Sequence, residues 1–242
     1  MTGGLPDEIN SFINDRNIFN IRKIQSDIYD YYGDGASKYD KDHKLKIKRI
    51  YDLIPSNLED KKKRVVVKNI ENIKGKRFSN YQDEFDFLIN SGIALEIKAI
   101  FPLIESSGKN LLKLYLNDVG LLSNILYKTN IKAILNDEKS INLGTVYEPV
   151  VARKLKAHGH NLFYYDNKAN GEVDFLIDDY DTLSFLPLEL KSGKNYTIHS
   201  AINKFLSNKS YNVKQGIVLS NEQKIFEKNN ILYLPIYFVM FL

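Results

Sequence analysis

Residues 171–191 read GEVDFLIDDYDTLSFLPLELK, and this segment is the strongest indication of how the C-terminal part of the chain folds. Side chains alternate in character in both of its halves, which is typical of β-strands. Period two divides the first half into two faces: Val173, Phe175 and Ile177 against Glu172, Asp174 and Leu176. In the second half the leucines share one face, and Glu189 and Lys191 share the other. If the two halves form a hairpin, Asp174, Glu189 and Lys191 converge on one side of a sheet.

The elements around this hairpin predict an α/β domain over residues 141–242. A helix is expected from Leu143 to near Gly159, with Glu148 at the margin of its buried face. A strand is expected at 162–165, followed by the two strands of the hairpin at 172–177 and 185–191. A helix is expected at 198–206, followed by strands at 216–219 and 231–234. Helices interspersed among strands in this order are typical of an α/β domain.

Three carboxylates and one amine from these elements suggest a metal-dependent hydrolytic site. Carboxylate oxygens are the ligands that Mg²⁺ prefers, and Mn²⁺ accepts the same donors. Glu148, Asp174 and Glu189 are the predicted metal ligands, and Asp174, Glu189 and Lys191 are the predicted catalytic residues. Lys191 would orient a water or offset charge on a phosphate. The alternative is an ordinary surface ion pair on a strand with mixed charges.

The N-terminal part predicts helices followed by a short β-ribbon. Helical spacing covers residues 7–32 and 41–54, with Pro55 closing the second helix, and Ser79-Asn80 resembles the N-cap of a third. Strands are expected at 93–100 and 111–116, joined by a turn at 106–108. This order predicts a winged-helix-like domain at 38–140 after a helical linker region at 1–37. A small α+β packing domain without a ligand is the alternative.

Charge is unevenly distributed along the chain. The net charge of the 242 residues is only +4, yet residues 38–77 hold fourteen Lys or Arg against six Asp or Glu. A concentration of this kind suits phosphate contacts, and the run Lys61, Lys62, Lys63 and Arg64 is the predicted nucleic-acid-binding segment. A solvated helical surface is the simpler interpretation of the same residues.

Composition also bears on the setting of the protein. The chain has no cysteine, which excludes disulfides and thiolate metal sites. No secretory signal pattern stands at the N-terminus, and the apolar run 231–242 is shorter than the roughly 20 residues that cross a bilayer. We therefore expect a cytoplasmic protein with no membrane partner, and we expect the apolar run to form a buried final strand.

Several motifs together resemble a known family. These are LGTVYEPVVA at 143–152, FYY at 163–165, GEVDF at 171–175, LELKSG at 188–193, KLYLNDVGL at 113–121 and GGLP at 3–6. They resemble a prokaryotic domain of unknown function that follows an AAA-type ATPase module in many predicted ATP-binding proteins. The resemblance spans nearly the whole chain. It implies a winged-helix-like segment followed by a PD-(D/E)XK restriction-endonuclease-like domain, and a chain that is the C-terminal part of a longer architecture.

The resemblance is incomplete in one respect, because the chain contains no Gly-x-x-x-x-Gly-Lys-Ser/Thr phosphate-binding loop. ATP hydrolysis by these residues is therefore not expected. The expected function is Mg²⁺- or Mn²⁺-dependent hydrolysis of DNA phosphodiesters. The alternative is a catalytically inactive module that binds nucleic acid or protein and targets an AAA-type ATPase, in the same chain or another. A purely structural or oligomerising domain is the third possibility.

Overall fold

The structure is a computed structural model, and it describes residues 2–35, 41–60, 62–100, 111–128, 130–136, 143–192 and 196–242. The chain divides into two compact units. Unit 1 comprises Met1–Glu96 and Leu112–Ile141, and unit 2 comprises Ile97–Leu111 and Asn142–Leu242. The predicted turn at 106–108 and Lys61 lie outside the described residues.

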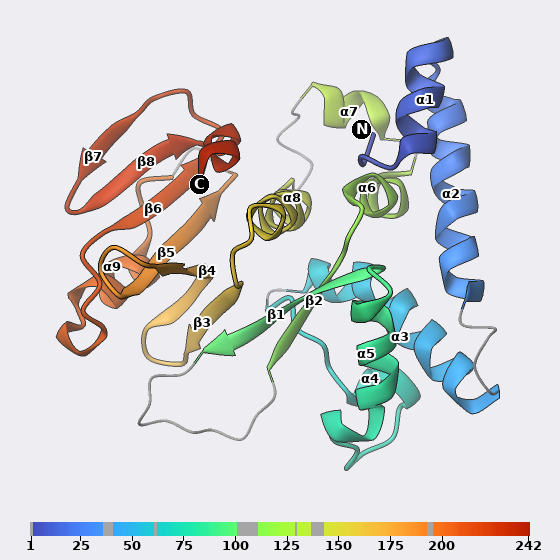
Figure 1. The fold of residues 1–242 in the computed structure, drawn as a ribbon, viewed down its shortest axis with the longest axis horizontal. Coiled ribbons are helices and arrows are strands. Elements are labelled where there is room, and N and C mark those ends of the chain that lie inside the picture. Colours follow the sequence, from blue (N-terminus) through green and yellow to red (C-terminus); the bar gives the residue numbers. More distant parts are fainter. Residues whose placement is uncertain are drawn as a thin grey trace. The chain divides into compact units, whose positions relative to one another are not determined.

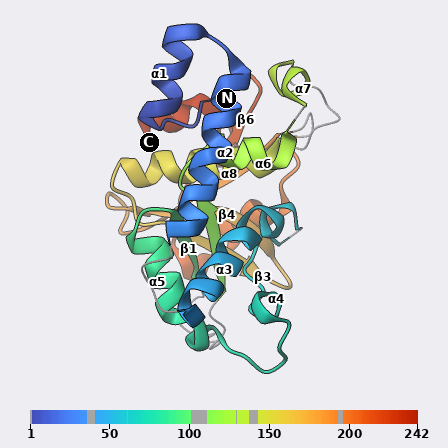
Figure 2. The same ribbon diagram turned by 90° about the vertical axis from the view of Figure 1, so that its right-hand side faces the viewer.

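Unit 1 is mainly helical (Figure 1). Its elements are α1 (Pro6–Asp15), α2 (Ile18–Gly35), α3 (Lys41–Glu59), α4 (Lys68–Glu71), η2 (Phe78–Tyr81), α5 (Gln82–Asn90), the start of β1 (Ala94–Ile100), β2 (Leu112–Leu116), α6 (Val119–Tyr127) and α7 (Ile131–Leu135). Helix α2 packs against α1, α3 and α6, and Figure 2 shows α2 as the long helix beside α1. Helix α3 also packs against α5 and β2, and its Ile54 and Leu58 are fully buried.

Two predictions for unit 1 are wrong in their details. The helical pattern at 7–32 is split into α1 and α2, because Arg16 takes a left-handed conformation with a φ of 51° and ends α1. Pro55 lies inside α3 instead of ending it, and the helix continues to Glu59. Proline removes one backbone hydrogen bond, but continuation of the helix buries Leu58 completely, and that burial offsets the loss.

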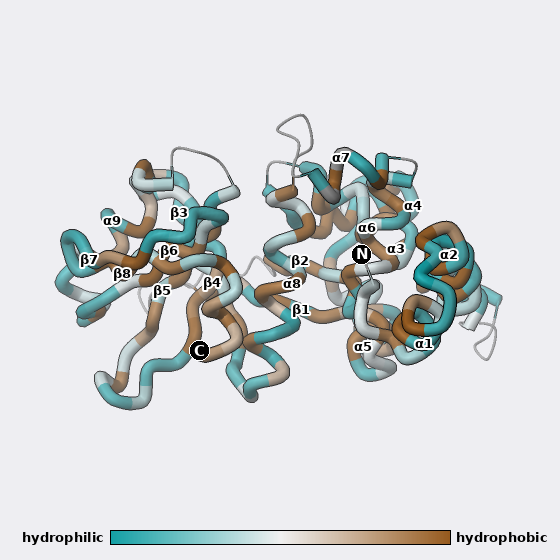
Figure 3. Tube along the Cα trace, turned by 90° about the horizontal axis from the view of Figure 1, so that it is seen from above, coloured by the Kyte–Doolittle hydropathy of each residue, from teal (hydrophilic) through white to brown (hydrophobic). Residues whose placement is uncertain are grey.

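Unit 2 contains the end of β1, then α8 (Gly144–Ala157), β3 (Phe163–Asn167), β4 (Gly171–Asp179), β5 (Ser184–Lys191), α9 (Ser200–Ser207), η3 (Lys209–Tyr211), β6 (Gly216–Ser220), β7 (Phe226–Lys228), β8 (Ile231–Pro235) and η4 (Ile236–Phe241). The strand order of the sheet is β2-β1-β3-β4-β5-β6-β8-β7, and the division between the units falls within β1. Brown colouring marks the apolar residues of β6 and β8 in Figure 3. The mixed α/β class is thus confirmed.

Strand β4 is central to unit 2 and pairs with both of its neighbours in antiparallel orientation. The β3–β4 register shifts between Phe163 and Tyr165, which marks a β-bulge. Because of this bulge, Val173 and Leu176 belong to the same core cluster. The sequence pattern had placed them on opposite faces, so strict period two is wrong at this point of β4.

One hydrophobic core of unit 2 lies between the sheet and α9. It combines three buried residues of α9, namely Ala201, Ile202 and Phe205, with residues of four strands: Tyr165, Val173, Leu176, Val218, Ile231 and Tyr233. The final apolar run is a strand only over β8; residues 236–241 form the 3₁₀ helix η4, whose exposed Phe241 and Met240 show that this segment is not a buried strand.

Candidate functional site

The β4–β5 hairpin brings the predicted acidic residues close to each other. The two strands pair in register from Phe175 and Leu188 to Asp179 and Ser184. Asp174 lies one residue before this ladder on β4, and Glu189 one residue beyond it on β5. The carboxylate of Asp174 accepts the backbone N–H of Leu190 at 2.7 Å. Asp174 is thereby fixed against the segment of β5 that carries Glu189 and Lys191.

Glu189 and Lys191 are in direct contact, because residues two apart on a strand project from the same face. The Lys191 Nζ lies 2.6 Å from Glu189 Oε1. Glu189 is buried, whereas the side chain of Lys191 is 30% exposed. The second oxygen, Glu189 Oε2, is buried and has no hydrogen-bond partner among the described residues. A buried carboxylate oxygen without a partner is uncommon, and a bound cation or water commonly explains one.

Glu189 faces the side of the sheet that α9 covers. The register of β5, β6 and β8 places Glu189 beside Val218, and Val218 beside Tyr233. Both Val218 and Tyr233 pack in the α9 core, and paired residues of a parallel sheet share a face. The cluster around Glu189 is therefore completed by residues from β8 and from the start of α9.

Two such residues form a buried hydrogen-bonded pair. The Nε2 of His199, the residue before α9, lies 2.6 Å from the hydroxyl of Tyr233. Burial raises the pKa of Tyr233, and the nearby Tyr196 and Glu189 raise it further. His199 Nδ1 is buried and has no partner among the described residues. The sequence pattern did not select Tyr233, because its neighbours on the sheet follow only from the parallel register of β5, β6 and β8.

Glu148 lies on α8, which packs against β5 and η4. The helix continues through Pro149, and Glu148 is buried with 7% of its surface exposed. The hydroxyl of Tyr147 accepts a hydrogen bond from Asn221 Nδ2 at 3.1 Å, which ties this part of α8 to the residue after β6. Over the described residues, no group of three or more His, Cys, Asp or Glu side chains is arranged to hold a metal ion.

The predicted nucleic-acid-binding segment lies in unit 1 and is described from Lys62 onward. Lys62 is exposed, and Lys63 has a left-handed backbone with a φ of 48°. Arg64 is half-buried, with its Nε and Nη2 atoms covered. The next residue, Val65, donates its N–H to Leu112 of the β2 strand at 2.9 Å. The segment is thus partly built into the packing of unit 1.

The architecture and this cluster define a protein with a mainly helical N-terminal unit and a C-terminal α/β unit that carries acidic and basic side chains on paired strands. The chain belongs to the family described as Domain of unknown function (DUF8612), whose model matches residues 1–132. A second family model, Domain of unknown function (DUF4143), matches residues 143–239. The predicted resemblance to a domain of unknown function is thus confirmed, whereas neither description mentions an ATPase or a nuclease.

Searches of curated proteins and of solved structures gave no match. None of the helices in the described part of the chain is long and apolar enough to cross a membrane.

Proposed function

We propose that unit 2 is a PD-(D/E)XK-type phosphodiesterase that hydrolyses nucleic acid, with DNA as the expected substrate and Mg²⁺ or Mn²⁺ as the cofactor. The proposal rests on one observation: Asp174 is hydrogen-bonded across the hairpin to the backbone of Leu190, the residue between Glu189 and Lys191, whose side chains are in contact. Asp174 is held against the N–H of Leu190, and Lys191 lies 2.6 Å from Glu189. Two carboxylates and an amine within this short segment are the groups that metal-assisted hydrolysis needs.

The donors present suit a hard divalent cation. Glu189 Oε2 is buried and has no partner in the described part of the chain, so a cation would satisfy an atom that is otherwise costly to bury. Mg²⁺ usually binds one or two protein carboxylates and keeps waters or substrate phosphates as its other ligands. A site with fewer than three clustered acidic ligands therefore fits Mg²⁺. Asp174 and Glu189 would hold the ion, whereas Glu148 on α8, the third ligand predicted from the sequence, does not form a three-ligand group with them in the described part of the chain.

Each residue of the proposed site has a defined role in the reaction. A bound cation would polarise the phosphate and make a water more acidic. Lys191, whose amine is part-exposed, would place positive charge beside the phosphate or orient the attacking water. Glu189 would keep that amine in position through their contact. The winged-helix-like character of unit 1 belongs to the same proposal, with DNA as its partner.

The same contacts also favour a second function, that of a binding module without catalytic activity. Glu189 is already paired with Lys191, and Asp174 already accepts a backbone N–H, so both carboxylates have structural partners. Such a domain would bind nucleic acid or protein without cleaving it, and would target an AAA-type ATPase in the same chain or in another.

Nicking of supercoiled plasmid in Mg²⁺ or Mn²⁺ distinguishes the two functions. We expect the wild-type chain to nick the plasmid and EDTA to stop the reaction. Asp174→Ala and Lys191→Ala should each reduce the rate at least about a hundredfold. Asp181→Asn, which changes an exposed carboxylate in the turn after β4, is the matched control and should retain full activity. Absence of nicking by the wild-type chain, or equal nicking by all variants, would remove these residues from a hydrolytic role.

A further inference from the structure

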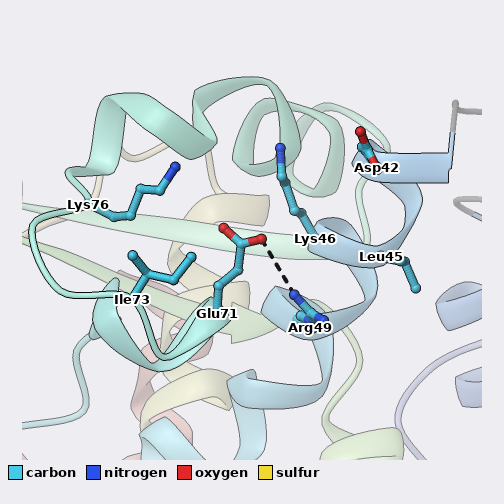
Figure 4. Close-up of a pocket in the computed structure, with 7 residues that line it drawn as sticks. All are labelled: Asp42, Leu45, Lys46, Arg49, Glu71, Ile73 and Lys76. Carbon is cyan, nitrogen blue, oxygen red and sulfur yellow. Dashed lines mark hydrogen bonds and ion pairs between the residues drawn. The ribbon is translucent and has the colours of Figure 1, made fainter.

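A pocket of about 340 Å³ lies on unit 1, far along the sequence from the acidic cluster of unit 2. Figure 4 shows its lining, which comes from α3, from the end of α4 and from the segment that follows α4. The lining residues are Asp42, Leu45, Lys46, Arg49, Glu71, Ile73 and Lys76. Its volume falls at the lower end of the roughly 300–1,000 Å³ that small-molecule sites occupy.

Two lysines give the pocket its positive character. Figure 4 shows Lys46 and Lys76 on either side of Glu71, with both amino groups directed the same way. Lys76 has neither an ion pair nor a hydrogen bond with any described residue. Among the residues that the structure describes, Lys46 has only a long contact of 3.8 Å with Glu84, whose Oε1 also lies 3.0 Å from His43. Both amines are therefore available to an anion.

Glu71, the acidic residue between the two lysines, already has a hydrogen-bond partner and an ion-pair partner. Glu71 accepts the hydroxyl hydrogen of Tyr81 at 2.6 Å and lies 3.5 Å from Arg49. Burial and the contact with Glu71 raise the pKa of Tyr81 to about 12, so its hydroxyl remains a donor at neutral pH. Because Tyr81 and Arg49 take up the charge of Glu71, this carboxylate opposes an incoming anion less than its position suggests.

Apolar side chains complete the lining. Leu45 is 44% exposed and Ile73 is 46% exposed, which are high values for residues of this kind. Figure 4 shows Ile73 beside Glu71 and Lys76, whereas Leu45 is directed away from them, so Ile73 offers the apolar contact for a ring and the lysines offer charge. A ligand that combines a flat apolar ring with a negative group fits both features.

We propose that this pocket binds a sugar–phosphate unit, with the phosphate between Lys46 and Lys76 and the sugar or base against Ile73. Such a unit is found in a free nucleotide and in a nucleic-acid strand. On this proposal, the principal phosphate contacts of unit 1 are made by Lys46 and Lys76, and not by the predicted segment 61–64. It does not depend on cleavage by unit 2.

Binding measurements on the full chain in EDTA test the proposal without any cleavage. The probes are adenosine 5′-monophosphate and a fluorescent single-stranded DNA of roughly twelve nucleotides. We expect Lys46→Glu combined with Lys76→Glu to weaken binding at least tenfold. The slope of affinity against salt concentration should fall by about one for each lysine. Saturable binding of both probes would identify a nucleotide pocket, and binding of DNA alone would identify a strand-binding site.

Lys23→Glu is the matched control, because Lys23 is an exposed lysine of unit 1 on α2. It should retain wild-type affinity. An equal loss of affinity in this control would show that only the overall charge matters and would overturn the proposal. Wild-type affinity in the double variant would also overturn it, as would a wild-type chain that binds neither probe. Circular dichroism checks folding, and Lys46→Gln with Lys76→Gln provides a milder pair that should also weaken binding.

Discussion

Two of the buried glutamates, one in each unit, are held in different ways. Glu8 of α1 is completely buried, and Glu189 of β5 is 5% exposed. Each has one oxygen that is bound by other groups, and a second oxygen that has no hydrogen-bond partner among the described residues. The two carboxylates differ in the groups that donate to them, and on the proposed hydrolytic function this difference separates a structural role from a functional one.

Glu8 is held by neutral donors. Its Oε2 accepts the N–H of Gly3 at 2.5 Å and the side-chain amide of Gln25 at 3.0 Å. Burial raises the pKa of Glu8, and the two hydrogen bonds only partly oppose this effect. The surroundings are tight, because a Cβ on Gly3 would collide with the carboxylate of Asp118. These contacts join the N-terminal segment to α2 and α6, which indicates a packing role for Glu8.

Glu189 is held by a cation that reaches the surface. Lys191 is 30% exposed, so the contact at 2.6 Å connects a buried carboxylate with solvent. A carboxylate in contact with a part-exposed amine can meet a ligand from outside, whereas the donors of Glu8 lie within the packing of unit 1. Burial alone therefore does not identify a site; the partner of the buried group and that partner's access to solvent do.

Neutralising each glutamate tests this comparison most strongly. On the proposed hydrolytic function, Glu189→Gln should reduce metal-dependent plasmid nicking at least about a hundredfold, because the amide oxygen is a much poorer ligand for Mg²⁺. Glu8→Gln keeps the shape of the side chain in unit 1 and should leave the rate within about twofold of wild type, a change that is small on the scale of a lost catalytic group. Initial rates at saturating Mg²⁺ measure both. Equal losses in the two variants would contradict the distinction.

Much of the fold could be predicted because its signals are local. Helix α8 and strands β4, β5 and β6 begin within about two residues of the predicted positions, since their apolar periodicity is strong. The break at Arg16 could not be predicted, because the helical spacing continues across it. Helix α6 was missed because residues 119–127 are apolar on most sides and show little periodicity.

The site could be predicted only in part. The hairpin register follows from alternation, and it brings Asp174 to the N–H of Leu190. The bulge in β4 has no residue signature in this chain, so the face of Val173 was assigned incorrectly, whereas Leu176 lies on the predicted face together with Glu189. The nearness of Tyr233 to His199 depends on the packing of β8 beside β6, which is long-range in sequence. Contacts of that kind need coordinates.

A smaller effect concerns stability. Glu8→Ala takes one acceptor from the Gly3 N–H and from the Gln25 amide, both within a closely packed region. Because each buried donor that loses an acceptor costs about 1–3 kcal/mol, we expect a loss of about 2–4 kcal/mol in the free energy of unfolding. Glu189→Ala should cost no more than about 1 kcal/mol, because the part-exposed Lys191 can be solvated instead. Urea-induced unfolding followed by circular dichroism compares the two, and a larger loss for Glu189→Ala would reverse the assigned roles.

The smallest effect is the pH dependence that Glu8 introduces. The pKa of Glu8 is raised above its ordinary value of 4.5 in the folded state, so the folded state binds this proton more tightly than the unfolded state does. The resulting stability is fully present below pH 4.5 and is lost as the pH rises through the folded-state pKa. Glu8→Gln removes this titration. The free energy of unfolding of wild type minus that of Glu8→Gln should therefore decrease as the pH rises from 4.5 and then level off. Urea unfolding of both proteins across this range measures the difference, and a constant or rising difference would show that Glu8 is not held in the protonated form that its buried position favours.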